Sequence, residues 1–415
     1  LVRWYFAVTD VAGRTSRWPL FADPLNSPER FGAMIEDRRF TTALPVWYWF
    51  TTNTAGAATR TGVRGSVWFD GAYYDNVFIR LRGGATSINS KKFDFNTGYH
   101  CRISDEVGRV EEANLNGGSS YDGTLTRPPL AFETLRAAGH PAEACFSVLL
   151  RVNAGADRLG YYVEQPDERF LDRWGLDRNG ALYKFDQRSA MTPAYSDNYD
   201  GVEKKTRLFE NNDDLLPVVA ALTNRADRVN LERFMFDHFD LANMANYLAC
   251  RALYNDFDDC RKNWYFYRDT EGSQEWMLLP WDKDGTFGIQ GDAGAWWPHP
   301  LFGDEAHLKA NASQWSFLWD ALFNTPRARD RYLRRLRTLM DTFLQTQPGY
   351  LEARANALWE PVYPHKGGTN TAVTAWLPTR RTQLYNTYSI TNPVLTNALI
   401  PLAQAALPAI VFGAA

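Results

Sequence analysis

The sequence lacks the cysteine and histidine groupings that identify many metal and redox proteins. Its four cysteines include no C-x-x-C pair, which argues against a zinc ribbon or a thiol redox motif. Its six histidines form neither H-E-x-x-H nor H-x-H, so we expect structural or surface roles for them. Nothing in the sequence requires a disulfide.

A charge imbalance and a long apolar run are also missing. The net charge of −3 over 415 residues is too near neutral for bulk attraction to nucleic acid, so we expect no nucleic-acid partner. No run approaches the roughly 18 apolar residues that span a bilayer, and we expect no integral membrane segment. The chain starts at Leu1 without a signal peptide, which we interpret as a processed or excised piece.

The composition is that of a folded protein. Hydrophobic residues make up 45% of the chain and aromatic residues 14%, enough to bury a sizeable core. The length allows one large two-lobed domain or two to three smaller ones. We expect a monomer.

Strand-like patterns dominate the first part of the chain. Asp70-Gly71 is a hairpin signal between two alternating segments, and a predicted helix at Leu130–Ala138 follows the third strand. The predicted strands are Gly62–Phe69, Tyr73–Arg82, Lys91–Phe95, Ala144–Val152 and Gly160–Glu164.

Helical patterns dominate the second part. Asn230 is predicted to cap a long helix, Leu231–Leu253, and a small strand is predicted at Ala181–Phe185. Further helices are predicted at Pro28–Asp37, Asp167–Trp174, Trp315–Phe323, Arg327–Gln345 and Tyr350–Leu358.

This order of elements is that of a protein kinase domain. The predicted fold class is α+β, with a β-rich N-lobe and a mainly α-helical C-lobe. We divide the chain into an extension (1–45), the N-lobe (46–165), the C-lobe (166–390) and an apolar tail (391–415).

The stretch Ala252–Gly288 carries the strongest chemical signal. Two strand-like runs, Trp264–Arg268 and Glu275–Trp281, flank a polar turn and form a predicted hairpin, whose ends meet. The hairpin therefore brings two acidic clusters together beside Asn263. Converging carboxylates and an amide suit a divalent metal and point to metal-assisted phosphoryl transfer. The clusters are Asp256/Asp258/Asp259 and Asp282/Asp284.

Several short motifs resemble those of the CotH kinase family (spore coat protein H-like). The most specific is Pro280-Trp281-Asp282-x-Asp284-x-Thr286-Phe287-Gly288, and the resemblance covers roughly residues 45–385. The others are Arg80-Leu-Arg82-Gly83-Gly84 with Lys91-Lys92, Gly160-Tyr-Tyr-Val-Glu164, Leu182-Tyr183-Lys184, Val202-Glu203-Lys204-Lys205-Thr206 and Asn263-x-Tyr265-x-Tyr267. The sequence departs from the family at Gly84, where Asn is expected.

The resemblance implies an atypical kinase that uses ATP and Mg²⁺ or Mn²⁺ to phosphorylate serine or threonine of a protein substrate. It also implies a secreted or cell-surface location. Two rival functions stay open on the sequence. One is a catalytically inactive binding or adhesion module on a kinase fold, and the other is a kinase-fold transferase that uses ATP for AMP transfer or ligation.

The resemblance assigns metal binding to Asp282, with Asn263 and Asp284 as further ligands. Asp258 lies five positions before Asn263, which is the kinase spacing between the base and the metal-binding Asn. Asp256 and Asp259 remain alternatives for the base. No His-Arg-Asp stands here, and each acid taken alone also fits a turn or a helix cap.

Phosphate contacts are expected from the predicted N-lobe. Lys91 or Lys92 is the candidate lysine, Lys92 slightly favoured, with Glu133 as its expected acidic partner. We interpret Trp281 as a core residue. The resemblance also implies cofactor contacts from Arg80, Arg82, Gly83, Gly84 and Lys184, and from Glu164 and Gln165 at a hinge.

Overall fold

The computed structural model describes most of the chain up to residue 390. The described ranges are 1–35, 40–83, 89–118, 122–185, 201–224, 226–256, 258–259, 262–289, 316–345 and 349–390. Gly84, Cys260 and the predicted tail lie outside these ranges. Within them, Cys101, Cys145 and Cys250 are free thiols.

Seven strands close into a barrel, in the order β11-β13-β12-β5-β6-β7-β8. Neighbours are antiparallel except β12 and β5, which run parallel. The barrel interior is apolar, with Val67, Ile79 and Phe93 fully buried. The strands are β5 (Val46–Phe50), β6 (Val63–Phe69), β7 (Ala72–Leu81), β8 (Lys91–Asp94), β11 (Glu112–Asn116), β12 (Cys145–Val152) and β13 (Asp157–Val163). The predicted strands are confirmed, whereas their closure into a barrel was not predicted.

The turn between β6 and β7 forms as its sequence predicts. Phe69 pairs with Ala72, and the two residues between them have positive φ, 47° at Asp70 and 74° at Gly71. A tight hairpin turn needs this left-handed backbone, which glycine adopts without steric cost. The turn starts the pairing of β6 with β7, whose register then shifts once, between Gly65 and Val67.

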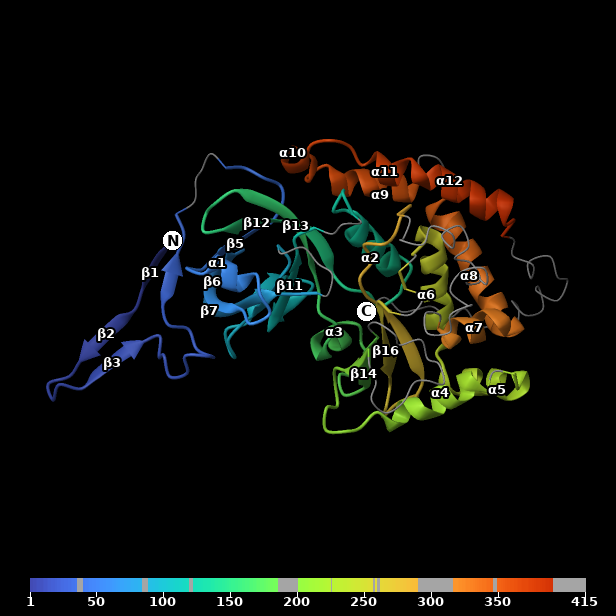
Figure 1. The fold of residues 1–415 in the computed structure, drawn as a ribbon, viewed down its shortest axis with the longest axis horizontal. Helices are drawn as coiled ribbons and strands as arrows, with labels where there is room; N and C mark the ends of the chain where they lie inside the picture. Colours follow the sequence, from blue (N-terminus) through green and yellow to red (C-terminus); the bar gives the residue numbers. More distant parts are fainter. Residues whose placement is uncertain are drawn as a thin grey trace.

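A second sheet has the order β15-β14-β16-β17, with every pair antiparallel. Its strands are β15 (Val202–Lys204), β14 (Ala181–Phe185), β16 (Trp264–Arg268) and β17 (Trp276–Pro280). The predicted strand at Ala181–Phe185 and the predicted hairpin are therefore confirmed. Helices pack against this sheet in the larger of the apolar cores, away from the barrel (Figure 1).

The helices and shorter strands complete the fold. The helices are α1 (Thr54–Ala57), α2 (Arg127–Ala137), α3 (Glu168–Arg173), α4 (Leu216–Thr223), α5 (Arg228–His238), α6 (Leu241–Tyr254), α7 (Phe317–Asn324), α8 (Pro326–Phe343), α9 (Tyr350–Trp359), α10 (Tyr363–Lys366), α11 (Thr371–Thr374) and α12 (Trp376–Thr382), with a 3₁₀ turn at Asp213–Leu215 and a π turn at Gln383–Thr387. A small hairpin joins β9 (Cys101–Ser104) and β10 (Gly108–Val110). Within the described residues, no helix is both long and apolar enough to cross a membrane.

Two helix predictions are wrong. The single helix at Leu231–Leu253 is two helices, because Phe239 is extended and the Asp240 carboxylate accepts a hydrogen bond from the Asn243 amide at 2.9 Å, capping α6. The helix at Pro28–Asp37 is absent over its described part, where β4 (Phe31–Ala33) pairs with β1 (Val2–Trp4).

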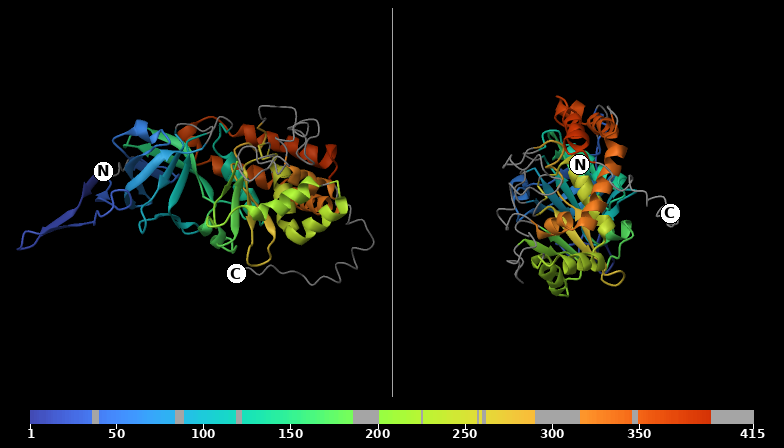
Figure 2. Two further views of the ribbon diagram at one scale, coloured as in Figure 1. Left: turned by 60° about the horizontal axis from the view of Figure 1, so that its bottom comes forward. Right: turned by 90° about the vertical axis from the view of Figure 1, so that its right-hand side faces the viewer.

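The first strands form an arm. Another pair, β2 (Phe6–Thr9) and β3 (Thr15–Trp18), extends from the barrel end of the molecule (Figures 1 and 2). Side chains of β2 are exposed along its whole length. The arm lies far from the second sheet and takes no part in the site described below.

Candidate active site

The β16–β17 hairpin joins the two acidic segments at its open end. Trp264 pairs with Pro280, and the Trp281 amide donates to the Asn263 carbonyl at 3.1 Å. Asn263 and Asp282 therefore leave the hairpin from neighbouring positions. The predicted convergence of the two segments is confirmed.

Asn263 and Asp282 have a backbone conformation that residues other than glycine rarely adopt. Asn263 has φ 66° and Asp282 φ 50°, both in the left-handed region. Such a conformation costs about 1–3 kcal/mol and is concentrated at functional sites. The Asn263 backbone amide donates a hydrogen bond to the Phe185 carbonyl at 3.1 Å, which helps to hold this residue against the strain.

A buried lysine ties the two segments together. Lys283 Nζ donates to Asp256 Oδ2 at 2.7 Å and to the Asn263 carbonyl at 3.1 Å. Burial lowers the pKa of Lys283, but the Asp256 carboxylate and other nearby oxygens outweigh burial and raise the pKa above its ordinary value. Asp256 is fully buried in this ion pair, so its position does not fit the alternative role of base.

Of the three acids, Asp258 is the accessible one. Its side chain is 23% exposed, and its Oδ2 accepts a hydrogen bond from Asn263 Nδ2 at 2.8 Å and lies 3.1 Å from Lys262 Nζ. Burial raises the pKa of Asp258 to about 6, against the effect of Lys262 and with help from Asp282 and Asp256.

The third acid of the cluster has a structural partner. Asp259 is fully buried, with Oδ1 2.5 Å from Arg251 Nε and Oδ2 3.3 Å from the Tyr247 hydroxyl. Its burial raises its pKa to about 6, although Arg251 opposes the change. The Asp259 carboxylate is therefore not accessible to a substrate and does not fit the alternative role of base.

Oxygen ligands for a cation stand at this end of the hairpin. Among the described residues, nothing donates a hydrogen bond to the Asp282 carboxylate or to Asn263 Oδ1. Asp284 follows on the same loop and is 9% exposed. No group of three or more His, Cys, Asp or Glu side chains in the described ranges is arranged to hold a metal. Two carboxylates and an amide oxygen still fit Mg²⁺, which keeps several waters and binds phosphate oxygens.

Two cations from different sheets converge on Trp281. The Arg82 guanidinium carbon lies 5.7 Å from the Trp281 ring centre, and Lys184 Nζ lies 5.3 Å from it. Arg82, just after β7, also donates to Asn116 Oδ1. Burial lowers the pKa of Arg82, against the opposing effects of Tyr161 and Asp282. The predicted phosphate contacts Arg82 and Lys184 thus meet beside Asp282.

A narrow cavity opens between these groups. Its volume is ≈ 10 Å³, room for about one water. Its lining comes from the barrel, from α2 and from the loop after β17: Arg82, Asn116, Pro128, Phe132, Tyr161, Val163, Trp281, Asp282 and Lys283. A larger cavity of ≈ 780 Å³, lined by Phe40, Tyr48 and Trp68 among others, lies by the β6–β7 turn and contains no predicted site residue.

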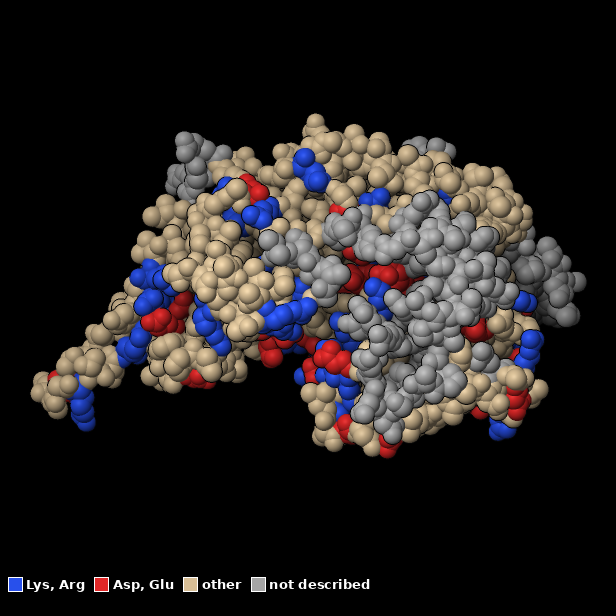
Figure 3. Space-filling view, viewed as in Figure 1, with Lys and Arg blue, Asp and Glu red and all other residues tan. Residues whose placement is uncertain are grey.

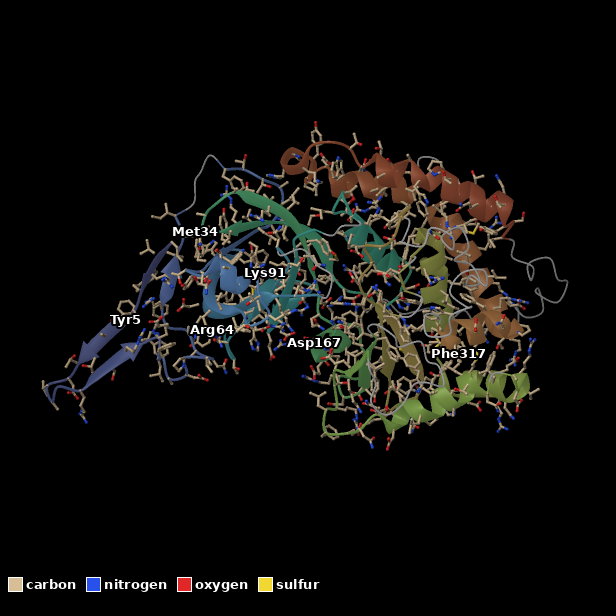
Figure 4. All side chains as sticks on the ribbon, in the orientation of Figure 1. Tyr5, Met34, Arg64, Lys91, Asp167 and Phe317 are labelled. Atoms are coloured by element: carbon tan, nitrogen blue, oxygen red, sulfur yellow. The ribbon has the colours of Figure 1, made fainter. Side chains whose placement is uncertain are left out.

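Strand alternation separates the two lysines of β8. Lys92 lies on the outer face with Arg80, and its Nζ is 2.5 Å from Glu112 Oε2 on β11. Lys91 is 4% exposed, on the same side of β8 as the buried Phe93, and burial lowers its pKa to about 8, with Arg158 adding to the effect. Figure 4 shows Lys91 on the barrel.

The prediction that Glu133 pairs with a lysine of β8 is wrong. The Glu133 carboxylate on α2 accepts hydrogen bonds from Arg354 on α9, one from Nη2 at 3.0 Å. Lys92 uses Glu112 of the neighbouring strand instead. Glu133 therefore links α2 to α9.

The carboxylate of Glu164, the predicted hinge residue, also has protein partners. Its carboxylate binds Arg173 of α3, with Oε1 3.0 Å from Nε, and accepts a hydrogen bond from the Ala144 amide at 2.9 Å. The Gln165 side chain bridges Asn114 at 3.0 Å and the Tyr265 hydroxyl at 3.2 Å. Glu164 thus links the end of β13 to α3, and Gln165 bridges the barrel and the second sheet; a cofactor role for Glu164 stays a prediction.

Gly83, the described glycine among the predicted phosphate contacts, has a left-handed backbone conformation that favours glycine. Gly83 has φ 78°, and its carbonyl accepts a hydrogen bond from Arg60. The site also uses residues that sequence reasoning missed: Lys283, Tyr161 and Asn116. Alternation along β11 and β13 indicates only which face the last two residues take, because their approach to Arg82 depends on the closure of the barrel; no signal marked Lys283.

Charged side chains accumulate around this region. Figure 3 shows basic and acidic side chains next to one another across the middle of one face, between the barrel and the sheet beside α3. On the barrel, Arg80 Nε lies 3.5 Å from Asp94 Oδ2. The face is mixed in charge, in keeping with the near-neutral sequence.

The profile of a family described as CotH kinase protein matches residues 79–379. Among solved structures, the chain is similar to the crystal structure of the Helicobacter pylori proinflammatory kinase CtkA, at 13% identity over 77% of this chain and 96% of that one, with a TM-score of 0.35. It is also similar to the Shewanella oneidensis MR-1 toxin–antitoxin complex of HipA, HipB and operator DNA, at 11% identity over 67% and 57%, with a TM-score of 0.26. No curated protein matches.

Proposed function

The chain belongs to the CotH kinase family, and on this premise we propose that it is an ATP- and divalent-metal-dependent protein kinase. It transfers the γ-phosphoryl group of ATP to a serine or threonine hydroxyl of a protein. In this proposal the barrel is the N-lobe and the helices with the second sheet form the C-lobe of a two-lobed, kinase-like fold. Family membership also supports a secreted or cell-surface location.

One observation carries the proposal. The β16–β17 hairpin brings Asp258 and Asn263 against Asp282, while Arg82 and Lys184 meet on the ring of Trp281 beside them. Phosphoryl transfer needs a metal site, a proton acceptor and cations for the phosphates, with little covalent chemistry from the protein. All three sets of groups stand within one region of this chain.

The metal site is assigned to Asp282 and Asn263, with Asp284 next to them. When bound, Mg²⁺ or Mn²⁺ would neutralise charge that develops on the transferred phosphoryl group. The Asp282 carboxylate and Asn263 Oδ1, which accept no hydrogen bond from the described residues, are the oxygen donors that such an ion would take.

Asp258 is assigned as the proton acceptor. As the substrate hydroxyl attacks the γ-phosphorus, its proton would pass to the Asp258 carboxylate, while the bond from that phosphorus to the bridging oxygen breaks and ADP leaves. A base with a pKa of about 6 is ionised at neutral pH and still accepts a proton in the transition state. The hydrogen bond from Asn263 Nδ2 to Oδ2 fixes the orientation of the carboxylate.

The phosphates are assigned to cations from both sheets. Arg82 and Lys184 both lie over the Trp281 ring, and Lys92 lies on the outer barrel face with Arg80. Bound phosphates would take over part of the charge balance that the Trp281 ring and Glu112 now supply. These residues bind and orient the nucleotide, whereas Asp258 and Asp282 act on the reacting groups.

A label-transfer experiment tests the proposal. Wild-type protein, Asp282→Ala and Asp237→Asn are incubated with γ-labelled ATP, Mg²⁺ or Mn²⁺ and a serine-rich protein. Asp237 is an exposed carboxylate on α5, 56% accessible, and serves as the matched control. Label should reach the acceptor with wild type and Asp237→Asn and should require the metal. Equal incorporation by Asp282→Ala would refute the assigned site.

A further inference from the structure

Lys283 stands between the two aspartates of the metal loop, and the proposed chemistry gives it no task. Its side chain is fully buried, away from solvent. Nζ donates three hydrogen bonds, to Asp256 Oδ2 at 2.7 Å, to the Asn263 carbonyl at 3.1 Å and to the Tyr247 hydroxyl at 3.2 Å. An ammonium group has three protons, so this one is fully satisfied.

We propose that Lys283 is a positioning residue, which fixes the base Asp258 and the amide ligand Asn263 relative to the metal ligand Asp282. The inference rests on the proposed function and adds a residue that acts through others. Lys283 touches no reacting group. It works because it belongs to the metal loop but makes its bonds to the segment that carries the base.

Two routes lead from Lys283 to Asp258. In the first, Asp256 Oδ2 binds Lys283 while its Oδ1 accepts the backbone amide of Asp258 at 3.1 Å. In the second, Lys283 holds the Asn263 carbonyl, and Asn263 Nδ2 donates to Asp258 Oδ2 at 2.8 Å. Asp258 is therefore held at both its backbone and its carboxylate. A shift of the metal loop would move the base with it.

The surrounding charges keep this arrangement rigid. Arg251 and Asp259 form a second buried ion pair at 2.5 Å, and the Tyr247 hydroxyl contacts both Lys283 and Asp259. Two cations and two carboxylates are thus buried together with no net charge. A group that moved away from its partner would leave a buried charge unpaired, which is strongly destabilising. Movement of any single member of the cluster is therefore disfavoured.

Stability alone does not require the pair. A buried ion pair is often replaced by uncharged side chains of similar volume at little cost, since its desolvation offsets its attraction. The Asp256–Lys283 pair nevertheless links the two loops that must stay aligned for transfer. Misplacement of a catalytic group by about 1 Å can cost roughly 100-fold in rate. We therefore expect the pair to matter for turnover more than for folding.

The test uses the double variant Asp256→Asn/Lys283→Met, which removes both charges and leaves no unpaired carboxylate. Initial rates of γ-phosphoryl transfer are measured against ATP concentration with saturating Mg²⁺, together with thermal unfolding. A positioning role predicts a kcat lower by roughly 100-fold with a KM for ATP within about threefold of wild type. The control is Glu352→Gln/Arg381→Met, another pair at 2.5 Å that lies away from the site, and it should keep kcat.

Each outcome decides a separate claim. A folded double variant with kcat within twofold of wild type overturns the positioning role alone. Wild-type protein without transfer activity overturns the proposed function, and the inference falls with it. If the double variant does not fold, Asp256→Glu decides, since it keeps both charges and shifts the carboxylate that Lys283 binds. Its kcat should fall about tenfold at unchanged KM, and an unchanged kcat would contradict the inference.

Discussion

Replacing the base should make the protein more stable and inactive at the same time. Asp258 is held in a site that raises its pKa from 3.8 to about 6. The ionised carboxylate is therefore about 3 kcal/mol less favourable in the folded chain than in the unfolded chain. Asp258→Asn removes that charge and keeps an oxygen that accepts from Asn263. The raised pKa already contains the opposing effect of Lys262, so the expected gain is about 3 kcal/mol.

The gain should depend on pH in a defined direction. Because the folded pKa is the higher one, the folded state binds the proton more tightly, and ionisation destabilises it as pH rises from 3.8 to about 6. Asp258→Asn should then exceed wild type fully above pH 6 and lose its advantage as pH falls toward 3.8.

Urea unfolding without metal, from pH 4 to 8, measures this difference. The same variant should lose about 10²- to 10⁴-fold in kcat, as expected for a general base. A variant less stable than wild type at pH 7.5, or a gain that does not change with pH, would refute the reasoning about Asp258.

Three further predictions follow from the site. Asp282→Ala should lower kcat/KM by more than about 100-fold and remove the Mg²⁺-dependent part of the stabilisation by ATP, which for wild type at 100 times Kd is about 2.7 kcal/mol; an unchanged thermal shift would count against the metal assignment. Glu112→Gln should raise the KM for ATP several-fold because Glu112 orients Lys92, whereas Glu133→Gln should leave it within about twofold because Glu133 binds Arg354; steady-state kinetics with the reverse order would contradict the pairing. Lys184→Met should raise the KM for ATP about tenfold by loss of a charged phosphate contact, and isothermal titration with ATP and Mg²⁺ should show the same weakening.

Local signals in the sequence predicted much of the fold. Turn chemistry at Asp70-Gly71 and alternation in its flanking strands gave β6 and β7, and the hairpin pattern gave the convergence of Asn263 with Asp282. Each of these depends on residues close together in the chain. The aspartate that caps α6, Asp240, is an equally local signal, but it was not recognised. The apolar stripe that continues across this position favoured one continuous helix instead.

Features that depend on contacts between residues far apart in the sequence could not be predicted from local signals. Closure of the barrel needs β8 to meet β11, and Glu133 finds Arg354 221 residues further on. The choice among the three acids also depended on burial. Asp256 and Asp259 are occupied by Lys283 and Arg251, which the spacing to Asn263 alone could not reveal.

The intact mass of a serine-rich acceptor protein, after incubation with ATP and Mg²⁺, tests the central claim most directly. Wild-type protein should add about 80 Da per modified residue, the mass of a phosphoryl group, and Asp282→Ala should add none. An adenylyl mass would show that a different phosphorus of ATP is attacked. No added mass with wild type, under conditions where ATP and Mg²⁺ stabilise the protein, would contradict phosphoryl transfer and leave a nucleotide-binding module.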